Sequence, residues 1–168
     1  MIAWRAGAVI SILRVQSTAR MLCCGSLEVI PVSEANRQLT QRWFNEVWNQ
    51  RNSAVIDEMF SPNGRAHGFP EPDSVLVGPG HFKTLHATFC GAFPDLHFVL
   101  DDIVCEGNRV AVRWTSTMTH LGDHFGFPAS KKKTTLSGSS FLTFENGMIM
   151  DGWNFMEMHR LMETLRGD

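Results

Sequence analysis

The sequence predicts an α+β domain in which helices precede an antiparallel sheet. Up to Pro94 the apolar residues recur about every four positions, a spacing typical of amphipathic helices. After Pro94 apolar and polar residues alternate, which is typical of strands that bury one face. Two short turns, Gly107-Asn108 and Asn146-Gly147, separate the alternating runs, so we expect neighbouring strands to form a meander.

Three helices are expected before Pro94. Ser33 can cap the first, which extends to about Arg51 and carries four apolar residues at helical spacing: Leu39, Trp43, Val47 and Trp48. Ser53 opens a shorter helix with the sequence AVIDEMF, and Pro79 suits the first turn of a third helix. The apolar stripe of the third helix consists of Phe82, Leu85, His86 and Phe89.

The strands account for the remainder of the domain. Asn63-Gly64 predicts a turn between the second and third helices, followed by a short extended piece, RAHGF. After Pro94 we expect strands over residues 96–106, 110–120 and 134–145, and a last strand from the Asn146-Gly147 turn to about Met158. One side of the second of these strands carries Val110, Val112, Trp114 and Met118.

Residues 1–30 differ from the rest of the chain. They contain Arg5, Arg14 and Arg20 but no acidic residue before Glu28, and their apolar run is too short to span a membrane. Two interpretations stay open: a targeting leader, which would allow export or organelle import, or a loose tail with Met21 nearer the true start. We expect residues 31–168 to form a single domain, with a cytoplasmic location as the simpler default.

The composition excludes several classes of function. Hydrophobic residues make up 43% of the 168 residues and charged residues 19%, which is ordinary for a soluble globular protein. The net charge of −2 argues against nucleic acid as the main partner, and Lys131-Lys132-Lys133 is interpreted as a solvated loop. The four cysteines form no CxxC pair, so no metal site or other cofactor is required. Because the chain has no tyrosine, no mechanism can use a phenol.

The last two strands predict a candidate ligand pocket. In the segment FENGMIMDGWNFMEM, alternation places Asn154 in one row with four other residues: Met148, Met150, Gly152 and Met156. The neighbouring strand carries Gly138 and Ser140 on one mostly apolar side. Glycines and small polar residues on an apolar face are compatible with a ligand pocket. The alternative is a packed core that contains a hydrogen-bonded amide and hydroxyl.

Three histidines are further candidates, although a histidine on an apolar face is most often an ordinary core residue. His120 ends the second long strand, His67 lies in the short extended piece, and His86 lies on the stripe of the third helix. Their spacing matches no metal-binding motif, and no nucleophile elbow or glycine-rich phosphate loop is present.

The sequence resembles the SnoaL-like polyketide cyclases of the nuclear transport factor 2-like superfamily over about residues 34–158. The segments that carry the resemblance are RWFNEVWNQRNSAVIDEMF, GPGHFKTLHATFCGAFPDLHF and NRVAVRWTSTMTHLGDHFGFPASKKKTTLSGSSFLTFENGMIMDGWNF. The resemblance implies a cone-shaped fold, in which a curved antiparallel sheet wraps around the helices and leaves a cavity. It also implies an intramolecular aldol cyclisation of a polyketide ester without metal or nucleotide.

The resemblance places the catalytic aspartate of such cyclases at Asn154. A histidine common in those enzymes corresponds to Gly152, and a polar pair that holds the substrate corresponds to Gly138 and Ser140. An amide cannot shuttle a proton at neutral pH, although it can donate to a carbonyl and stabilise an enolate. Asp151, three residues earlier in the strand, is expected on the opposite face.

Three hypotheses follow. The first is a domain that binds a small apolar, carbonyl-bearing ligand at Asn154, with Ser140, Gly138, Gly152, His86 and Trp48 as ligand-binding candidates and with weak or altered chemistry. The second is a lyase or isomerase that uses His120 or His67 as base. The third is a non-catalytic assembly domain. The family's use of the outer sheet face and the aromatic residues Phe141, Trp153 and Phe155 predict a homodimer.

Overall fold

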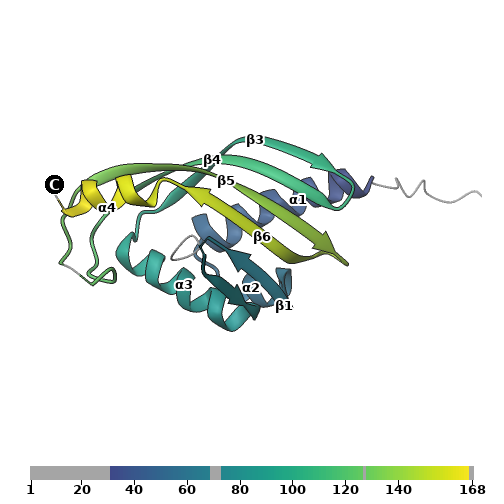
Figure 1. Cartoon of the computed structure of the whole chain (residues 1–168), viewed down its shortest axis with the longest axis horizontal. Coiled ribbons are helices and arrows are strands. Elements are labelled where there is room, and N and C mark those ends of the chain that lie inside the picture. The colour runs from purple at the N-terminus through teal and green to yellow at the C-terminus, as the bar shows by residue number, and fades with distance from the viewer. Residues whose placement is uncertain (1–30, 69–72, 127, 167–168) are drawn as a thin grey trace, which may run out of the picture.

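A curved sheet of six strands covers a layer of helices in the computed structural model, which describes residues 31–68, 73–126 and 128–166 (Figure 1). The strand order is β2-β1-β6-β5-β4-β3. All neighbours are antiparallel except β1 and β6, which are parallel. The strands are β1 (Phe60–His67), β2 (Val75–Val77), β3 (His97–Glu106), β4 (Arg109–Thr119), β5 (Lys133–Glu145) and β6 (Met148–Met156). The predicted α+β class and the meander from β3 to β6 are confirmed.

The helices occupy the concave side of the sheet, apart from a last helix that follows β6 (Figure 1). They are α1 (Val32–Arg42), the π-helix η1 (Trp43–Asn49), α2 (Ala54–Met59), α3 (Gly78–Ala92) and α4 (Met158–Arg166). The predicted cap at Ser33 is wrong, because the carbonyl of Pro31 already accepts the first helical bonds, from the amides of Glu34 and Ala35. Ser33 therefore lies inside the first turn of α1.

The predicted turn at Asn63-Gly64 is also wrong, since both residues lie within β1. The register between β1 and β6 shifts between Phe60 and Arg65. A Cβ at residue 64 would lie 2.9 Å from the carbonyl oxygens of Ile149 and Ser61. The glycine therefore allows two backbone segments to approach closely at an irregular strand pairing.

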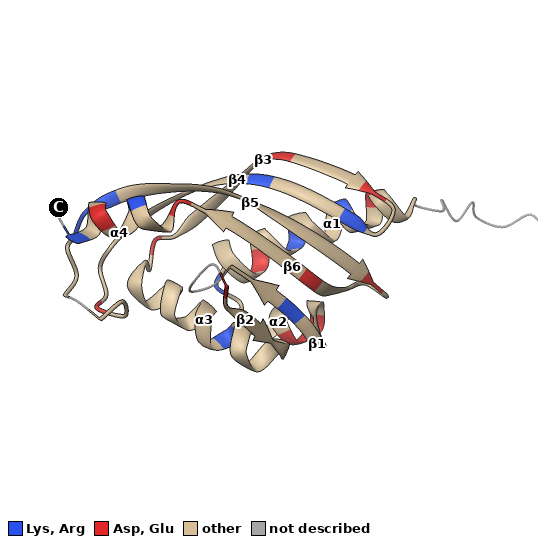
Figure 2. Ribbon diagram, viewed as in Figure 1, with Lys and Arg blue, Asp and Glu red and all other residues tan. Residues whose placement is uncertain are grey.

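Two elements were absent from the prediction. Strand β2 has three residues, too few to show a period. Helix α4 follows the last strand directly and buries Leu161 and Leu165. None of the helices in the described part of the chain has the length and apolar character needed to cross a bilayer. Figure 2 shows lysines, arginines and acidic residues interspersed over helices and strands.

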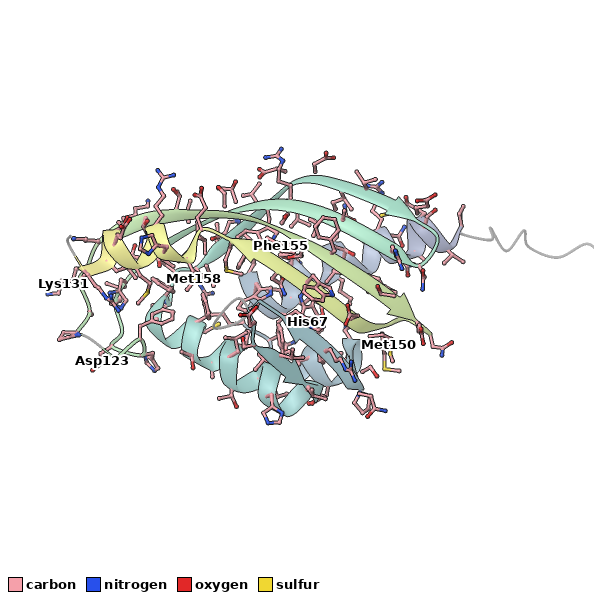
Figure 3. The ribbon with its side chains drawn as sticks, in the orientation of Figure 1. His67, Asp123, Lys131, Met150, Phe155 and Met158 are labelled. Atoms are coloured by element: carbon pink, nitrogen blue, oxygen red, sulfur yellow. The ribbon has the colours of Figure 1, made fainter. Side chains whose placement is uncertain are left out.

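A β-bulge changes the row of side chains that was predicted for β6. Thr143 pairs with Asp151 but Phe144 pairs with Ile149, so Met150 is the extra residue (labelled in Figure 3). As a result Ile149 is the buried residue at the start of β6, with 1% exposure, whereas Met148 and Met150, predicted to face inward, are only half-buried. Beyond the bulge, Gly152 is again buried.

Candidate functional site

A small cavity lies between the sheet and the helices η1 and α3. Its volume is about 40 Å³, and its wall is mostly apolar and aromatic. Helix η1 contributes Trp43, Phe44 and Trp48, and α3 contributes Phe82 and Phe89. The sheet supplies the polar groups: Ser116, Ser140 and Asn154.

Asn154 is held by a chain of hydrogen bonds that joins four strands. The indole Nε1–H of Trp114 on β4 donates to Ser140 Oγ on β5 at 3.0 Å. Ser140 Oγ–H donates to Asn154 Oδ1 on β6 at 2.7 Å, and Asn154 Nδ2–H donates to the backbone carbonyl of His67 on β1 at 3.1 Å. Ser140 and Asn154 are direct cross-strand partners, which explains their contact.

The direction of this chain follows from the chemistry of its members. An indole N–H can only donate, so Ser140 receives that bond and gives its single hydrogen to Asn154. The amide oxygen of Asn154 therefore faces Ser140, and its nitrogen faces the carbonyl of His67. The amide nitrogen carries two hydrogens, and the bond to His67 uses one of them.

Four predicted site residues line the cavity: Asn154, Ser140, Gly152 and Trp48. Gly138 does not, because the ring of Trp114 fills the space above it. A Cβ at Gly138 would lie 2.5 Å from Cζ2 of that ring. The role of Trp114 was missed, although its register partner on β5 is Gly138 and alternation places it on the buried side of β4.

His67 lies on the outer face of the sheet. Ala66 is buried, so the next residue of β1 points the other way, as alternation requires. The His67 ring stacks on Trp153 with 4.0 Å between ring centroids, and its Nε2 lies 2.9 Å from Asp151 Oδ1 (His67 labelled in Figure 3). Asp151 is also on this face, as predicted. Only the backbone carbonyl of His67 reaches the candidate site.

His120 is buried just beyond β4 and does not line the cavity. Its Nδ1 accepts the backbone N–H of Ser130 at 3.0 Å, which requires the hydrogen of a neutral ring to be on Nε2. The ring packs beside Phe93 and Phe125. His120 therefore closes the base of the loop that carries Asp123 and Lys131, seen beside α4 in Figure 3.

His86 is buried on α3 behind the wall of the cavity. Its Nε2–H donates to the backbone carbonyl of Val47 at 2.7 Å, and its ring lies 5.2 Å from that of Trp48. Burial lowers the pKa of His86 by more than the hydrogen bond to Val47 raises it, and the nearby charge of Arg51 lowers it further. The imidazole is therefore neutral at neutral pH.

One lysine of the predicted basic cluster has a structural partner. Lys132 Nζ donates to the carbonyl of Thr164 at 2.9 Å and so joins the predicted basic cluster to helix α4. Within the described residues, no group of three His, Cys, Asp or Glu side chains could hold a metal ion.

Comparison with known proteins identifies similar sequences and folds. Residues 38–165 match the model of the family described as SnoaL-like polyketide cyclase. No curated protein sequence is detectably similar to the chain.

Solved structures with the same fold cover most of the chain. A protein from Jannaschia sp. CCS1, assigned as a SnoaL-like polyketide cyclase, has a TM-score of 0.75 at 20% identity, over 85% of this chain and 99% of that one. AclR from Streptomyces galilaeus, assigned as a hydroxylase, has a TM-score of 0.71 at 24% identity, over 81% and 83%. A SnoaL-like polyketide cyclase from Agrobacterium tumefaciens C58 has a TM-score of 0.62 at 16% identity, over 76% and 97%.

Proposed function

Because the chain belongs to the SnoaL-like polyketide cyclase family, we propose that it binds a small apolar molecule through a carbonyl oxygen, with little of the family's aldol chemistry. The observation that carries this proposal is the orientation of Asn154. Its amide oxygen and one N–H are used by Ser140 and His67, and its second N–H is the donor offered to a ligand. The apolar wall around it suits an apolar ligand.

The chemistry of the site favours binding over proton transfer. Neither the amide of Asn154 nor the hydroxyl of Ser140 titrates near neutral pH, so neither can act as an efficient general base. The cavity wall includes no histidine among the described residues, which weighs against a histidine-based lyase or isomerase. A donated N–H can still polarise a bound carbonyl and stabilise an enolate.

A ligand can enter the cavity only if the side chains that line it move. Pockets for small molecules usually measure about 300–1,000 Å³, and the cavity measures about 40 Å³. Met118 and Met156 line it, and methionine side chains adapt readily to a new neighbour. We therefore expect binding to be accompanied by a rearrangement of side chains.

Calorimetric titration with acetophenone and ethylbenzene tests the proposal. The two molecules have similar shapes, and only acetophenone carries an acceptor. We expect the wild type to bind acetophenone about 5- to 10-fold more tightly, because a hydrogen bond contributes about 1 kcal/mol. Asn154→Leu should remove this preference.

Asp151→Asn serves as the control, since Asp151 lies on the outer face and should not affect either dissociation constant. Equal affinities of the wild type for the two probes, or a preference that survives Asn154→Leu, would contradict the proposal.

A further inference from the structure

We propose that His86 is a positioning residue that latches η1 against α3, and that ligands reach the cavity when η1 opens locally. The second half of this inference rests on the proposed function, because it concerns ligand entry. The first half concerns only how η1 is held against α3, and it can be tested without any ligand.

Helix η1 is an unusual element. The amide of Gln50 donates to the carbonyl of Asn45, five residues earlier, and that of Asn52 donates to Glu46, six residues earlier. This wide winding is rare in proteins and occurs frequently at functional sites. The carbonyl of Val47, next in the series, takes its hydrogen bond from the side chain of His86, at 2.7 Å and 39 residues away in the sequence.

The bond between His86 and Val47 has one possible direction. A carbonyl oxygen can only accept, so Nε2 of the neutral imidazole carries the hydrogen. His86 is 4% exposed, which keeps water from replacing it. The bond therefore ties the last turn of η1 to the middle of α3.

The hydrogen bond between His86 and Val47 affects the cavity because Trp48, which follows Val47 directly, forms part of the cavity wall. The Trp48 ring lines the cavity and packs against the rings of Phe82, Phe89 and Phe98, at centroid distances of 6.0, 6.2 and 5.5 Å. A backbone movement at Val47 would carry Trp48 with it. The cavity would then grow at the boundary between η1 and α3.

The sheet forms the opposite wall of the cavity and is held more firmly than η1. Strands β3 to β6 form continuous ladders of backbone hydrogen bonds, which do not part without disrupting the sheet. The end of η1 is joined to the sheet side by side chains: Asn49 bonds to both backbone groups of Phe98, and Arg51 Nη2 donates to the carbonyl of Leu96. Proteins can open locally at a lower free energy than global unfolding. Opening the end of η1 breaks fewer backbone bonds than parting the sheet, so we take η1 as the wall that opens.

Hydrogen exchange of the amides of residues 43–52 tests the latch in the full chain. His86→Leu keeps apolar bulk but removes the donor, and we expect exchange in this segment to become about tenfold faster. His86→Gln places an amide N–H where the imidazole N–H was, and exchange should return close to the wild-type rate. His81→Leu, on the exposed side of the same helix, is the matched control and should change nothing there. A folded His86→Leu protein with wild-type exchange over residues 43–52 would overturn the inference.

The wild type supplies a test that does not depend on a variant. The amides of Gln50 and Asn52 should exchange faster than those of β4 and β5, through an opening smaller than global unfolding. If the η1 amides and the β4 and β5 amides exchange with the same free energy of opening, local opening at η1 is contradicted.

Ligand entry is tested separately, by the association rate of acetophenone in stopped-flow tryptophan fluorescence. We expect a several-fold faster rate for His86→Leu than for the wild type or His86→Gln. An unchanged association rate in His86→Leu would refute entry through η1. If the wild type binds acetophenone and ethylbenzene equally but hydrogen exchange is faster in His86→Leu, only the proposed function is refuted.

Discussion

Replacing Asn154 with aspartate introduces the group that the family's cyclases use, into a site arranged for an amide. Asn154→Asp changes almost no volume, and one carboxylate oxygen can still accept the hydrogen bond of Ser140. The other oxygen takes the place of Nδ2, which lies 3.1 Å from the carbonyl oxygen of His67. Two acceptors then face each other with no hydrogen between them.

The expected cost follows from these contacts. The lost bond to His67 contributes about 1 kcal/mol, and leaving a partly buried acceptor without a donor costs about 1–3 kcal/mol more. We therefore expect Asn154→Asp to lower the free energy of unfolding by about 2–4 kcal/mol at pH 7. A protonated carboxyl can donate to His67, so the pKa of the new residue should be raised in the folded state.

The sign of the pH dependence is then determined. Between the unfolded pKa of about 3.9 and the raised folded pKa, the native state binds more protons than the unfolded state. The stability of Asn154→Asp relative to the wild type should fall as the pH rises through this range. Chemical denaturation of both proteins at pH 4 and pH 7 measures it, with Asn63→Asp at an exposed position of β1 as the control. A variant as stable as the wild type at pH 7, or a loss of equal size at both pH values, would refute the reasoning.

The same variant tests the chemistry. Wild type should be a poor catalyst for cyclising an anthracycline-type ester. General acid–base catalysis contributes about 10²–10⁴-fold, and Asn154→Asp should gain less than this because Gly152 leaves the new acid without a supporting histidine. Brisk turnover by the wild type that survives Asn154→Ala and disappears in His120→Ala would instead favour a histidine-based enzyme.

Three further predictions concern assembly, the N-terminus and pH. The outer-face residues Phe141, Trp153 and Phe155 are 51%, 46% and 55% exposed. We therefore expect a homodimer that forms through this face. Light scattering that finds only monomer at micromolar concentration would contradict this prediction. Residues 1–30 lie outside the described part of the chain; a truncation that starts near Leu27 should keep the melting midpoint of the full chain, and loss of soluble protein would show that the segment is needed. Burial opposes ionisation of Asp95, but bonds from the amide and hydroxyl of Thr119 at 2.7 and 2.6 Å outweigh it and lower its pKa. The contribution of Asp95 to stability is present above its unfolded pKa of about 3.9 and is lost as the pH falls through its folded pKa. Asp95→Asn should therefore weaken the acid dependence of unfolding, and an unchanged dependence would contradict this.

Much of the fold could be predicted because the signals are local. The change from a period near four to a period of two at Pro94 predicted three helices followed by the meander of β3 to β6, within one or two residues of the observed bounds. The same alternation placed Ser140 and Asn154 on the inward side of two paired strands, where they line the cavity. Side-chain direction in a strand depends on the residue number alone as long as no bulge intervenes.

The tertiary structure decided what depends on contacts distant in sequence. The parallel pairing of β1 with β6 places His67 outside the sheet and its carbonyl beside Asn154, 87 residues away. The bulge at Met150 depends on the register with β5, and the filling of the space above Gly138 depends on Trp114 from a neighbouring strand. The carbonyl of Val47 in η1 takes a hydrogen bond from His86, 39 residues later. Alternation and helical period follow from one residue and its neighbours, whereas register, cavity volume and the partners of buried polar groups are set only when separate segments pack together.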